Sequence, residues 1–433
     1  MNKISALTYG CRTNQYETIC IVNQFLKAGW KFVPFNHQAN IYLINTCTVT
    51  NRAAYKSRYA IQKALKNRAK FYYSNVIVTG CYSQLNYDFV AEMGPIDLII
   101  DNNHKHEIFQ NFMSLKEPEF KDISLADKFA EQSTDSMINK HRAMIKIQDG
   151  CDYKCAFCAV TLARGPSRSR DPQNILDQIE ILTEKGYQEF ILTGINLGLY
   201  GQDKKDGYHL AQLISDINSI PKVKKIRISS LEPPNVTTEL LKSIARCKKV
   251  CSHFHLPMQS GSDHVLKYMG RNYSKAQFLD TCKAIKEIRP HAAIGVDVIA
   301  GLPGETEDYF NETRTFLENF PFAYFHVFPF SRRQGTKAYA LQNQVYGPDI
   351  KSRAKILTKL SREKEISFAF NLMRDRVLLS AVMESKTDST LEGVSDHYTR
   401  IHLQNASKYF GKMVKCRSIN FYPDGKLVVE VIS

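Results

Sequence analysis

Short apolar runs alternate with helical patterns over residues 1–115, and this alternation limits the folds that the chain can adopt. Four of the runs read KISALTYG, ANIYLINTC, NVIVTGC and DLII. Continuous apolar runs are typical of strands that are buried on both faces of a sheet, and helices between them allow neighbouring strands to be parallel. We therefore expect an α/β domain here, with a doubly wound parallel sheet.

A cysteine follows three of these four predicted strands, at Cys11, Cys47 and Cys81. In doubly wound sheets the functional groups collect beyond the carboxyl ends of the strands. We therefore expect the three thiols to converge, although more than 30 residues separate each from the next. Three separate buried thiols are the alternative, because a free cysteine is often a small core residue.

The alternation resumes after residue 140, where six further runs predict strands: MIKIQ, EFILTG, KIRISSL, FHLPM, AIGVDVIAG and FHVFPF. Helical patterns between them cover residues 174–185, 209–217, 274–288 and 305–320, and the third begins with a capping-box spacing from Ser274 to Gln277. Six such units are too few for an eightfold barrel. We expect an open, partial (β/α)6 barrel over residues 141–370, joined to the first domain by a polar linker over residues 116–140.

The last segment, residues 371–433, changes character. Four stretches are strand-like: MRDRVLLSAVMES, HYTRIHLQN, GKMVKCRSIN and KLVVEVIS. A turn is expected at Pro423-Asp424-Gly425. This pattern predicts a small all-β barrel, of the kind that often carries RNA-binding loops.

The formal net charge is +15, which favours a polyanionic partner, most commonly a nucleic acid. A merely basic protein is the alternative that composition leaves open. Residues 51–70 form a basic stretch without any acidic residue, which predicts a strongly positive surface helix. A second basic stretch covers residues 331–364.

The N-terminal stretch lacks the long apolar run of a signal peptide, and the chain has no run of eighteen apolar residues. We therefore expect a cytoplasmic protein without membrane contact. Thiols stay reduced in that compartment, and the number of cysteines is odd at eleven. Both points argue against a disulfide framework.

Residues 151–158 read CDYKCAFC and place Cys151, Cys155 and Cys158 close together. A zinc site normally closes with four paired ligands, yet the next cysteine along the chain is Cys247. Three thiolates can instead hold three irons of a [4Fe–4S] cluster and leave the fourth iron open to a ligand. An iron–sulfur site with an open iron is therefore our interpretation, with a structural zinc site as the alternative.

This spacing, with Phe157 directly before the last cysteine, resembles the signature of the radical S-adenosylmethionine (SAM) enzymes. In that superfamily SAM chelates the open iron, and its one-electron reduction yields a 5′-deoxyadenosyl radical. The resemblance implies that Cys151, Cys155 and Cys158 hold the radical-generating cluster. The cofactor contacts that we expect in addition are Tyr153, Phe157, Gly194, Ser230, Glu232, Gln259, Gly301 and Pro303.

Further motifs resemble the methylthiotransferases within this superfamily, over essentially the full chain. They include Cys11-x-x-Asn14-x-x-Glu17 and the stretches 45–50, 79–82, 163–169, 257–262 and 301–306. The resemblance implies that Cys11, Cys47 and Cys81 hold an auxiliary [4Fe–4S] cluster. It also implies that one SAM donates a methyl group, that another supplies the radical, and that the C-terminal barrel is a TRAM-like RNA-binding appendage.

The methylthiotransferases divide mainly into enzymes for isopentenyladenosine in tRNA, for threonylcarbamoyladenosine in tRNA, and for a ribosomal protein aspartate. Residues 193–201, 332–336 and 8–17 resemble the threonylcarbamoyladenosine branch. Asn196 stands where that branch often has His and is closer to the isopentenyladenosine branch. Ala159-Val160-Thr161 also departs from the Ile-Pro of many relatives, which puts the shape of that loop in question.

The partners implied are the anticodon stem-loop of a tRNA, an electron donor such as flavodoxin or ferredoxin, and a sulfur source. A non-catalytic iron–sulfur RNA-binding protein is the alternative from another functional class. His253 and His255 share one face of a strand, but no third metal ligand is evident beside them, so we expect packing or hydrogen bonding. We expect the remaining cysteines to be core or incidental residues: Cys20, Cys247, Cys251, Cys282 and Cys416.

Overall fold

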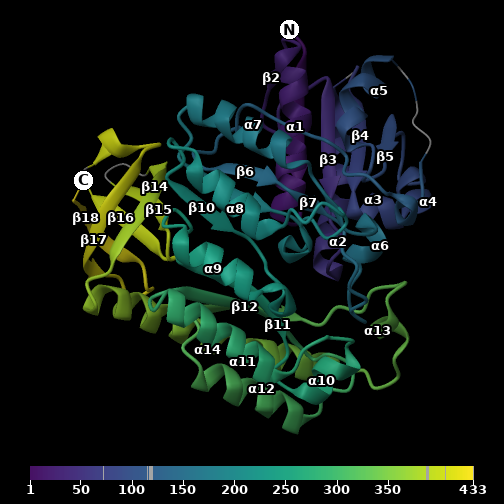
Figure 1. Ribbon diagram of the computed structural model, residues 1–433. Coiled ribbons are helices and arrows are strands. Elements are labelled where there is room, and N and C mark those ends of the chain that lie inside the picture. Colours follow the sequence, from purple (N-terminus) through teal and green to yellow (C-terminus); the bar gives the residue numbers. More distant parts are fainter. Residues whose placement is uncertain (72, 115, 117–119, 387–389, 405, 433) are drawn as a thin grey trace.

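The computed structural model describes residues 1–433 except 72, 115, 117–119, 387–389, 405 and 433. Figure 1 shows an N-terminal α/β part in purple and blue, a larger middle part in teal and green, and a small yellow barrel at the C-terminus. The fold class that the sequence predicts is confirmed in all three parts.

The N-terminal part is a parallel sheet with strand order β2-β1-β3-β4-β5. Its strands are β1 (Lys3–Thr8), β2 (Lys31–Phe32), β3 (Ile41–Thr46), β4 (Asn75–Gly80) and β5 (Leu98–Ile100). The short edge strand β2 is the one that the sequence did not predict. The helices are α1 (Arg12–Lys27), α2 (Asn51–Lys70), α3 (Cys81–Leu85), α4 (Tyr87–Ala91) and α5 (Ile108–Ser114).

Strand β3 explains why the sheet is covered on both faces. All six of its residues are buried. Tyr42 and Ile44 belong to the apolar cluster that includes Ile61 of α2, whereas Ile41 and Leu43 belong to the cluster that includes Phe25 of α1. Successive side chains of a strand point to opposite faces, so a continuous apolar run serves both layers.

The middle part is the predicted partial barrel. Its strands are β6 (Ala143–Lys146), β9 (Glu189–Thr193), β10 (Lys225–Ile228), β11 (His253–Gln259), β12 (Ala293–Ala300) and β13 (Tyr324–Pro329). They form two three-stranded parallel units, β6-β9-β10 and β11-β12-β13. Parallel bridges from Ile226 to Val250 and from Ser230 to His255 join the two units.

Helices cover the outside of this barrel. They are α7 (Pro172–Glu184), α8 (Leu210–Ser219), α9 (Thr238–Arg246), α11 (Lys275–Ile288) and α12 (Glu307–Asn319). Three shorter helices are α6 (Val160–Arg164), which contacts α3, and α10 (Asp263–Tyr268) and α13 (Lys337–Ala340), which pack near Ala156. The capping box at Ser274 and Gln277 is present at the start of α11. Two short strands, β7 (Gln148–Asp149) and β8 (Arg168–Ser169), pair beside the barrel.

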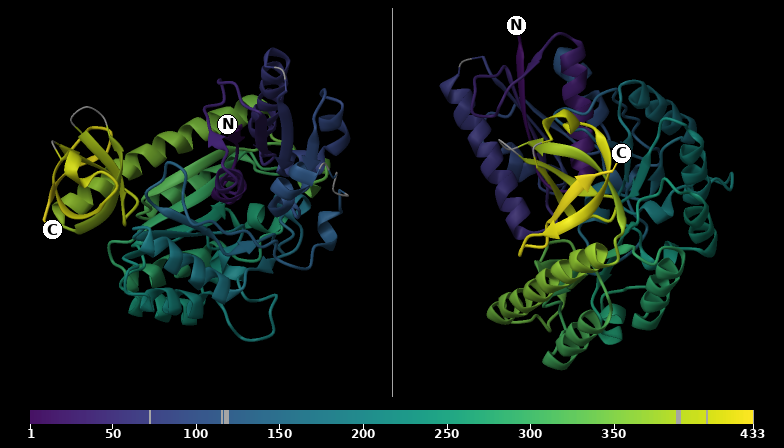
Figure 2. Two further views of the ribbon diagram at one scale, coloured as in Figure 1. Left: turned by 90° about the horizontal axis from the view of Figure 1, so that it is seen from above. Right: turned by 90° about the vertical axis from the view of Figure 1, so that its left-hand side faces the viewer.

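The long helix α14 (Gly347–Arg374) connects the partial barrel to the C-terminal barrel. It packs along β13 and continues past residue 370, where the sequence suggested a domain boundary. Residues 373–374, expected in a strand, therefore end a helix. In the left-hand view of Figure 2, α14 reaches from the yellow barrel back toward the N-terminal part.

The C-terminal barrel is closed, with strand order β14-β15-β16-β18-β17. Its strands are β14 (Leu378–Lys386), β15 (Thr390–Ser395), β16 (Arg400–Gln404), β17 (Met413–Phe421) and β18 (Leu427–Val431). Strand β15 was not predicted, because TLEGVS contains Glu and Gly, which are depleted in strands.

The segment expected to be a linker includes residues 117–119, which lie outside the described residues. Its described part is largely irregular, yet it is anchored to both flanking domains. The Tyr16 hydroxyl donates to the Gln132 carbonyl oxygen at 2.7 Å, and the Gln178 amide donates to the Thr134 carbonyl oxygen at 2.8 Å. The segment therefore fastens α1 to α7 instead of leaving the two domains independent.

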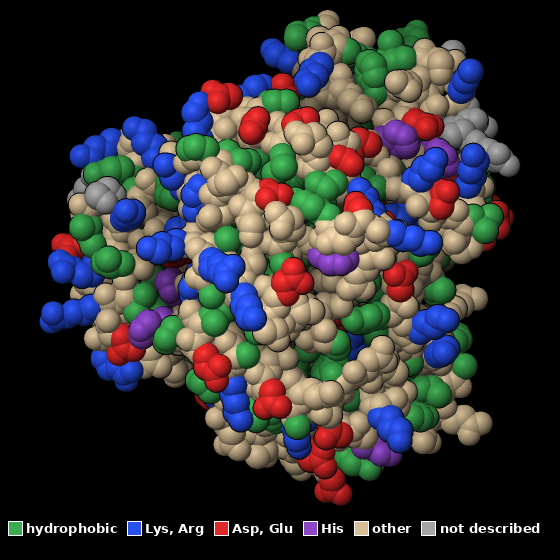
Figure 3. Space-filling view, in the orientation of Figure 1, with side chains coloured by type: hydrophobic (Ala, Val, Ile, Leu, Met, Phe, Trp, Pro, Cys, Tyr) green, Lys and Arg blue, Asp and Glu red, His purple; other side chains and the backbone are tan. Residues whose placement is uncertain are grey.

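The five cysteines expected in the core are buried: Cys20, Cys247, Cys251, Cys282 and Cys416. Among the described residues, no helix combines the length and the apolar character needed to cross a membrane. Figure 3 shows many Lys and Arg side chains over the C-terminal barrel.

Candidate functional site

The loop that carries Cys151, Cys155 and Cys158 follows the first barrel strand and is held at three points. The Cys151 amide donates to the Gly165 carbonyl oxygen at 3.1 Å, and the Ala156 amide donates to the Met269 carbonyl oxygen at 2.9 Å. The Cys158 amide closes a tight turn onto the Cys155 carbonyl oxygen at 3.1 Å. These backbone bonds fix the loop without using the thiols.

Gly150 permits the close approach that positions Cys151. Its φ is 71°, and a Cβ atom there would lie 1.8 Å from the Pro166 carbonyl oxygen. A side chain would therefore collide with backbone, which cannot move aside, so this turn requires glycine.

The three thiols of this loop come together. Burial, together with the neighbouring Cys158 and Cys155 thiols, raises the pKa of Cys151 to about 12. Burial and Cys155 likewise raise the pKa of Cys158. A metal ligand must be a thiolate, so a bound cationic cluster would have to displace these protons.

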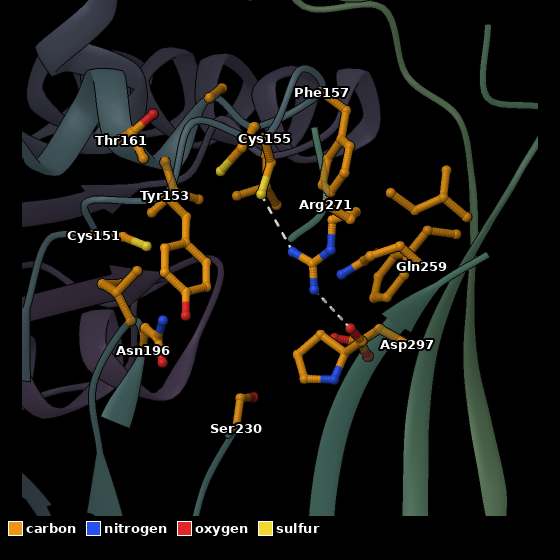
Figure 4. Close-up of a pocket in the computed structure, with 18 of the residues that line it drawn as sticks. Cys151, Tyr153, Cys155, Phe157, Thr161, Asn196, Ser230, Gln259, Arg271 and Asp297 are labelled. Carbon is orange, nitrogen blue, oxygen red and sulfur yellow. Dashed lines mark hydrogen bonds between the residues drawn. The ribbon is translucent and has the colours of Figure 1, made fainter. Parts of the chain in front are cut away.

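Arg271 ties Cys155 to a buried carboxylate. Its Nη1 donates to the Cys155 sulfur at 3.2 Å, and its Nη2 forms an ion pair with Glu232 and donates to the Pro257 carbonyl oxygen at 3.0 Å. Figure 4 shows the guanidinium pointing toward Cys155 inside the cavity. Burial raises the pKa of Glu232, and Arg271 opposes this shift. Sequence reasoning missed Arg271, which lies beyond the end of α10 and in none of the motifs.

A cavity of about 300 Å³ opens over the three thiols. Five of the expected cofactor contacts line it together with the cysteines: Tyr153, Phe157, Ser230, Glu232 and Gln259. Gly194, Gly301 and Pro303 do not line it. The Gly301 amide instead donates to Glu305 at 2.8 Å, and a Cβ atom on Gly301 would lie 2.4 Å from Ile350 of α14. Cofactor contact by these three residues stays a prediction.

The second set of thiols comes from three neighbouring strands. Cys11 follows β1 and precedes α1, Cys47 follows β3, and Cys81 follows β4 and begins α3. Burial raises the pKa of Cys47 to about 12, and the Cys81 and Cys11 thiols contribute in the same direction. The thiols therefore lie near one another at the carboxyl edge of the sheet.

Gly10 makes room for this convergence. Its φ is 99°, and a Cβ atom there would lie 2.8 Å from the Cys47 sulfur. The loop after β1 can approach Cys47 only because this residue has no side chain.

A buried ion network connects the two sets of cysteines. Arg164, six residues after Cys158, pairs through Nη1 with Glu17 and with Asp149, each at 2.8 Å. Lys146 contacts both carboxylates at 2.7 Å, and Lys105 contacts Glu17 at 2.6 Å. Burial alone would raise the pKa of Glu17, but these three cations hold it well below its usual range.

The buried ion network joins the segments that carry the two cysteine sets. Glu17 lies on α1, directly downstream of Cys11, whereas Asp149 lies two residues before Cys151. Each carboxylate is therefore attached to the loop of a different cysteine set, and Arg164 bridges them. Lys105 follows β5, and nothing in the sequence pattern singled it out.

Comparisons with known proteins agree with this arrangement. Residues 145–317 match the radical SAM superfamily, and residues 3–101 match Uncharacterized protein family UPF0004. A threonylcarbamoyladenosine tRNA methylthiotransferase, MtaB, of Bacillus subtilis (strain 168) is 34% identical over 99% of this chain and 97% of its own length. The MtaB of Aquifex aeolicus (strain VF5) is 37% identical over 84% of this chain and 89% of its own length. The chain belongs to the radical SAM methylthiotransferases, in the MtaB branch.

Two further comparisons place this methylthiotransferase more broadly. A tRNA-2-methylthio-N(6)-dimethylallyladenosine synthase of Clostridium botulinum (strain Okra / Type B1) is 31% identical over 98% of this chain and 93% of its own length. Among solved structures, the radical SAM methyltransferase TsrM from Kitasatospora setae has a TM-score of 0.56 at 12% identity, covering 76% of this chain and 74% of that chain. This likeness shows a shared fold.

The cofactors of this family are SAM and [4Fe–4S] clusters, and the residues present fit them. Each cysteine set offers three converging thiols, so each can hold three irons and leave one iron open. Val49 and Thr50, from the loop that follows Cys47, line the same cavity as Cys151, Cys155 and Cys158. The loop that follows Cys47 therefore reaches the cavity that opens over the other cysteine set.

The structure corrects the expectation that no third metal-capable group lies beside the two histidines. Asp297 of β12 accepts from His255 at 3.0 Å and from His326 of β13 at 3.2 Å. These groups come from three neighbouring strands, so their sequence spacing could not reveal them. His255 also bonds Ser230 at 2.9 Å, and His253 stacks on Tyr398 at 4.1 Å between ring centroids.

Proposed function

We propose that this protein adds a 2-methylthio group to N6-threonylcarbamoyladenosine next to the anticodon of tRNA. The observation that carries the proposal is the pair of converging cysteine sets, with the loop after Cys47 reaching the cavity over Cys151, Cys155 and Cys158. Relatives named for this reaction align over nearly the whole chain, which supports the choice of substrate.

The side chains around the cavity divide the work. When bound, the two [4Fe–4S] clusters and SAM supply the radical, the sulfur and the methyl group. Cys151, Cys155 and Cys158 would hold the SAM-binding cluster, and Cys11, Cys47 and Cys81 would hold the auxiliary cluster. Glu232 and Gln259 offer a carboxylate and an amide to the polar part of SAM, and Tyr153 and Phe157 exclude water from the reacting groups.

An adenosine in the anticodon loop suits this cavity, because its base is already outside a duplex and can be unstacked at low cost. Asn196 lines the cavity, and its amide lies 3.5 Å from the Asn235 side-chain oxygen. Asn235 in turn accepts from the Tyr153 hydroxyl at 2.8 Å. This polar chain is where we place recognition of the adenosine N6 substituent.

A second candidate substrate is isopentenyladenosine, which Asn196 favours by resemblance. Methylthiolation of a ribosomal protein aspartate is a third reading, and the basic charge of the chain weighs against it. The alternative that is not an enzyme is a non-catalytic iron–sulfur RNA-binding protein.

Mass spectrometry of tRNA nucleosides from cells with and without the gene tests the proposal. We expect methylthio-threonylcarbamoyladenosine to disappear on deletion and to return when the gene is restored. Loss of the methylthio-isopentenyl nucleoside instead would assign the second candidate, and unchanged nucleosides would defeat both tRNA readings. Formation of 5′-deoxyadenosine from SAM by the reduced, reconstituted protein would exclude a non-catalytic role.

The reaction also requires partners, which we propose by chemical class. A low-potential electron donor such as flavodoxin or ferredoxin would reduce the SAM-binding cluster, and a sulfur source would replenish the auxiliary cluster. Because the substrate is tRNA, we place the protein in the cytoplasm.

A further inference from the structure

Helix α2 carries an exposed stripe of cations and aromatic rings. Six residues make up this stripe: Arg52, Tyr55, Lys56, Tyr59, Lys63 and Lys66. At 100° per residue they fall within an arc of about 100° on the helix surface. Tyr55 is 61% exposed and Tyr59 is 57% exposed, which is unusual for two large rings one turn apart.

The fold itself does not account for the stripe. The buried side of α2 consists of Ala54, Ser57, Ala60, Ile61 and Ala64, which pack on the sheet. Within the described part of the chain, no side-chain hydrogen bond or ring contact involves Tyr55 or Tyr59, and no carboxylate lies within 4.0 Å of the basic groups of Arg52, Lys56 or Lys66.

Two neighbouring arginines of the same helix provide the contrast. Arg68 pairs with Asp97, and Arg58 donates to the Tyr82 hydroxyl at 3.2 Å. Both lie outside the stripe and are occupied by contacts within the domain. Within the stripe, Lys63 is half-buried with its Nζ 5.7 Å from the centre of the Phe35 ring, so Arg52, Lys56 and Lys66 are the cations that remain available to a partner.

The stripe begins at the reaction cavity. Thr50 caps α2 and lines the cavity, and the Asn51 amide donates to the Ser331 hydroxyl at 2.8 Å. Arg333 donates to the Asn51 side chain at 2.7 Å, which fastens this end of α2 to the barrel rim. From there the helix runs outward for about 30 Å along one edge of the molecule, as the right-hand view of Figure 2 shows.

We propose that the α2 stripe is a docking surface for the anticodon stem-loop, separate from the C-terminal barrel; this rests on the proposed function. Arg52, Lys56 and Lys66 neutralise backbone phosphates, and Tyr55 and Tyr59 stack on unpaired loop bases. Cations spaced along the helix follow a phosphate backbone, while exposed rings select unstacked bases over a duplex. A helix that starts at the cavity thereby leads the loop toward the reacting groups.

Binding measurements with the reconstituted full-length protein test this surface, using an anticodon stem-loop RNA and a fully paired RNA of equal length. Lys56→Glu/Lys66→Glu is expected to weaken binding of both RNAs at least tenfold and to lower the slope of log K against log salt by about 2. Tyr55→Ala/Tyr59→Ala is expected to weaken binding of the stem-loop roughly tenfold or more, and to leave the paired RNA unaffected. Tyr55→Phe/Tyr59→Phe keeps both rings and is expected to bind like the wild type.

Lys242→Glu/Lys283→Glu is the matched control. These exposed lysines lie on α9 and α11, and the same charge change there is expected to leave RNA binding within twofold. Equal losses in this control and in the α2 variant would overturn the docking surface, because net charge alone would then explain both. Stem-loop binding that survives the tyrosine to alanine changes would overturn it as well.

The outcome is separable from that of the proposed function. If the wild type forms the methylthio nucleoside while the α2 variants bind RNA normally, the docking surface is wrong and the function stands. If the α2 variants lose RNA binding while no tRNA nucleoside depends on the gene, the surface stands and the proposed reaction fails. Melting temperatures of all variants identify any loss that is caused by unfolding.

Discussion

The two cysteine sets each bring three thiols together, but by different structural means. Cys151, Cys155 and Cys158 lie in one loop, held by backbone hydrogen bonds within the middle part. Cys11, Cys47 and Cys81 come from three strands and meet only because β1, β3 and β4 are adjacent in the sheet. The first set is therefore a property of a local loop, whereas the second is a property of a folded domain.

This difference predicts which changes each set tolerates. A local loop can keep its ligands together when distant parts of the chain are disturbed. A set assembled from a sheet depends on strand register, on Gly10 and on every element that holds the strands in place. The Glu17–Arg164–Asp149 network joins the two sets, so damage there reaches both.

Cys155→Ala tests the local set and is expected to have the largest effect. The SAM-binding cluster loses a ligand, so reductive cleavage of SAM falls to background. The readout is 5′-deoxyadenosine formed by the reconstituted, reduced enzyme. Cys416→Ala, which changes a buried cysteine of the C-terminal barrel, is the control and should retain cleavage. Cleavage at the wild-type rate in Cys155→Ala would remove this cysteine from the site.

Cys47→Ala tests the dispersed set and should separate the two activities. Cleavage of SAM stays measurable, because Cys151, Cys155 and Cys158 are intact. The methylthio nucleoside is no longer formed. Iron content should fall by about half in the isolated variant, since one of two clusters loses a ligand. Equal loss of cleavage in Cys47→Ala and Cys155→Ala, with both proteins folded, would contradict the division of labour.

The same contrast explains what could be predicted from the sequence. The spacing within CDYKCAFC predicts a cluster directly, because all three ligands lie within eight residues. Cys11, Cys47 and Cys81 could be grouped only by first predicting parallel strands, and the structure confirms that sheet. The apolar pattern therefore predicted the second set only indirectly: it predicted the strands, and the strands placed the three cysteines at their carboxyl ends.

Contacts that depend on side-chain direction were not accessible in this way. Arg271 reaches Cys155 from a separate segment, and His326 meets Asp297 across neighbouring strands. A lysine is normally expected at the surface, so a sequence pattern does not predict that Lys105 is buried. Its charge is stabilised by Glu17, which lies on α1. The packing that brings these groups together is set by the whole fold, so no local pattern carries it.

Arg164→Gln probes the link between the sets. It removes one of the two cations that contact both Glu17 and Asp149, the other being Lys146. Two buried carboxylates are left undercompensated, at a cost of about 3–5 kcal/mol in the free energy of unfolding. The control is Arg314→Gln, which removes an exposed pair with Glu318 at 2.8 Å and should cost at most about 1 kcal/mol. Chemical denaturation measures both values. Similar costs for the two variants would mean that the network does not fasten the domains.

Gly10→Ala probes the packing of the dispersed set alone. The new Cβ atom would lie 2.8 Å from the Cys47 sulfur, and the positive φ adds backbone strain of about 1–3 kcal/mol. We expect lower iron occupancy and less methylthiolation, with cleavage of SAM retained. Gly29→Ala is matched, because that residue also has a positive φ of 84° but no atom within 4 Å of the new Cβ. Gly29→Ala should therefore have the same backbone strain but keep its iron. Loss of iron in both variants would mean that backbone strain, not the contact with Cys47, causes the loss.

The smallest expected effect concerns the metal-free protein, in which Cys47 is buried and Cys151 is partly buried. Burial raises the pKa of Cys47 and of Cys151 to about 12, above the unfolded value of about 8.5. Between these values the folded state binds more protons than the unfolded state, so stability is full below pH 8.5 and falls as pH rises. At pH 9.5 each thiol should remove about 1.4 kcal/mol from the free energy of unfolding. Cys47→Ala and Cys151→Ala should each flatten this decline by a similar amount, because the pKa of both thiols is raised to about 12. An unchanged slope in either variant would show that its thiol is already hydrated in the metal-free fold.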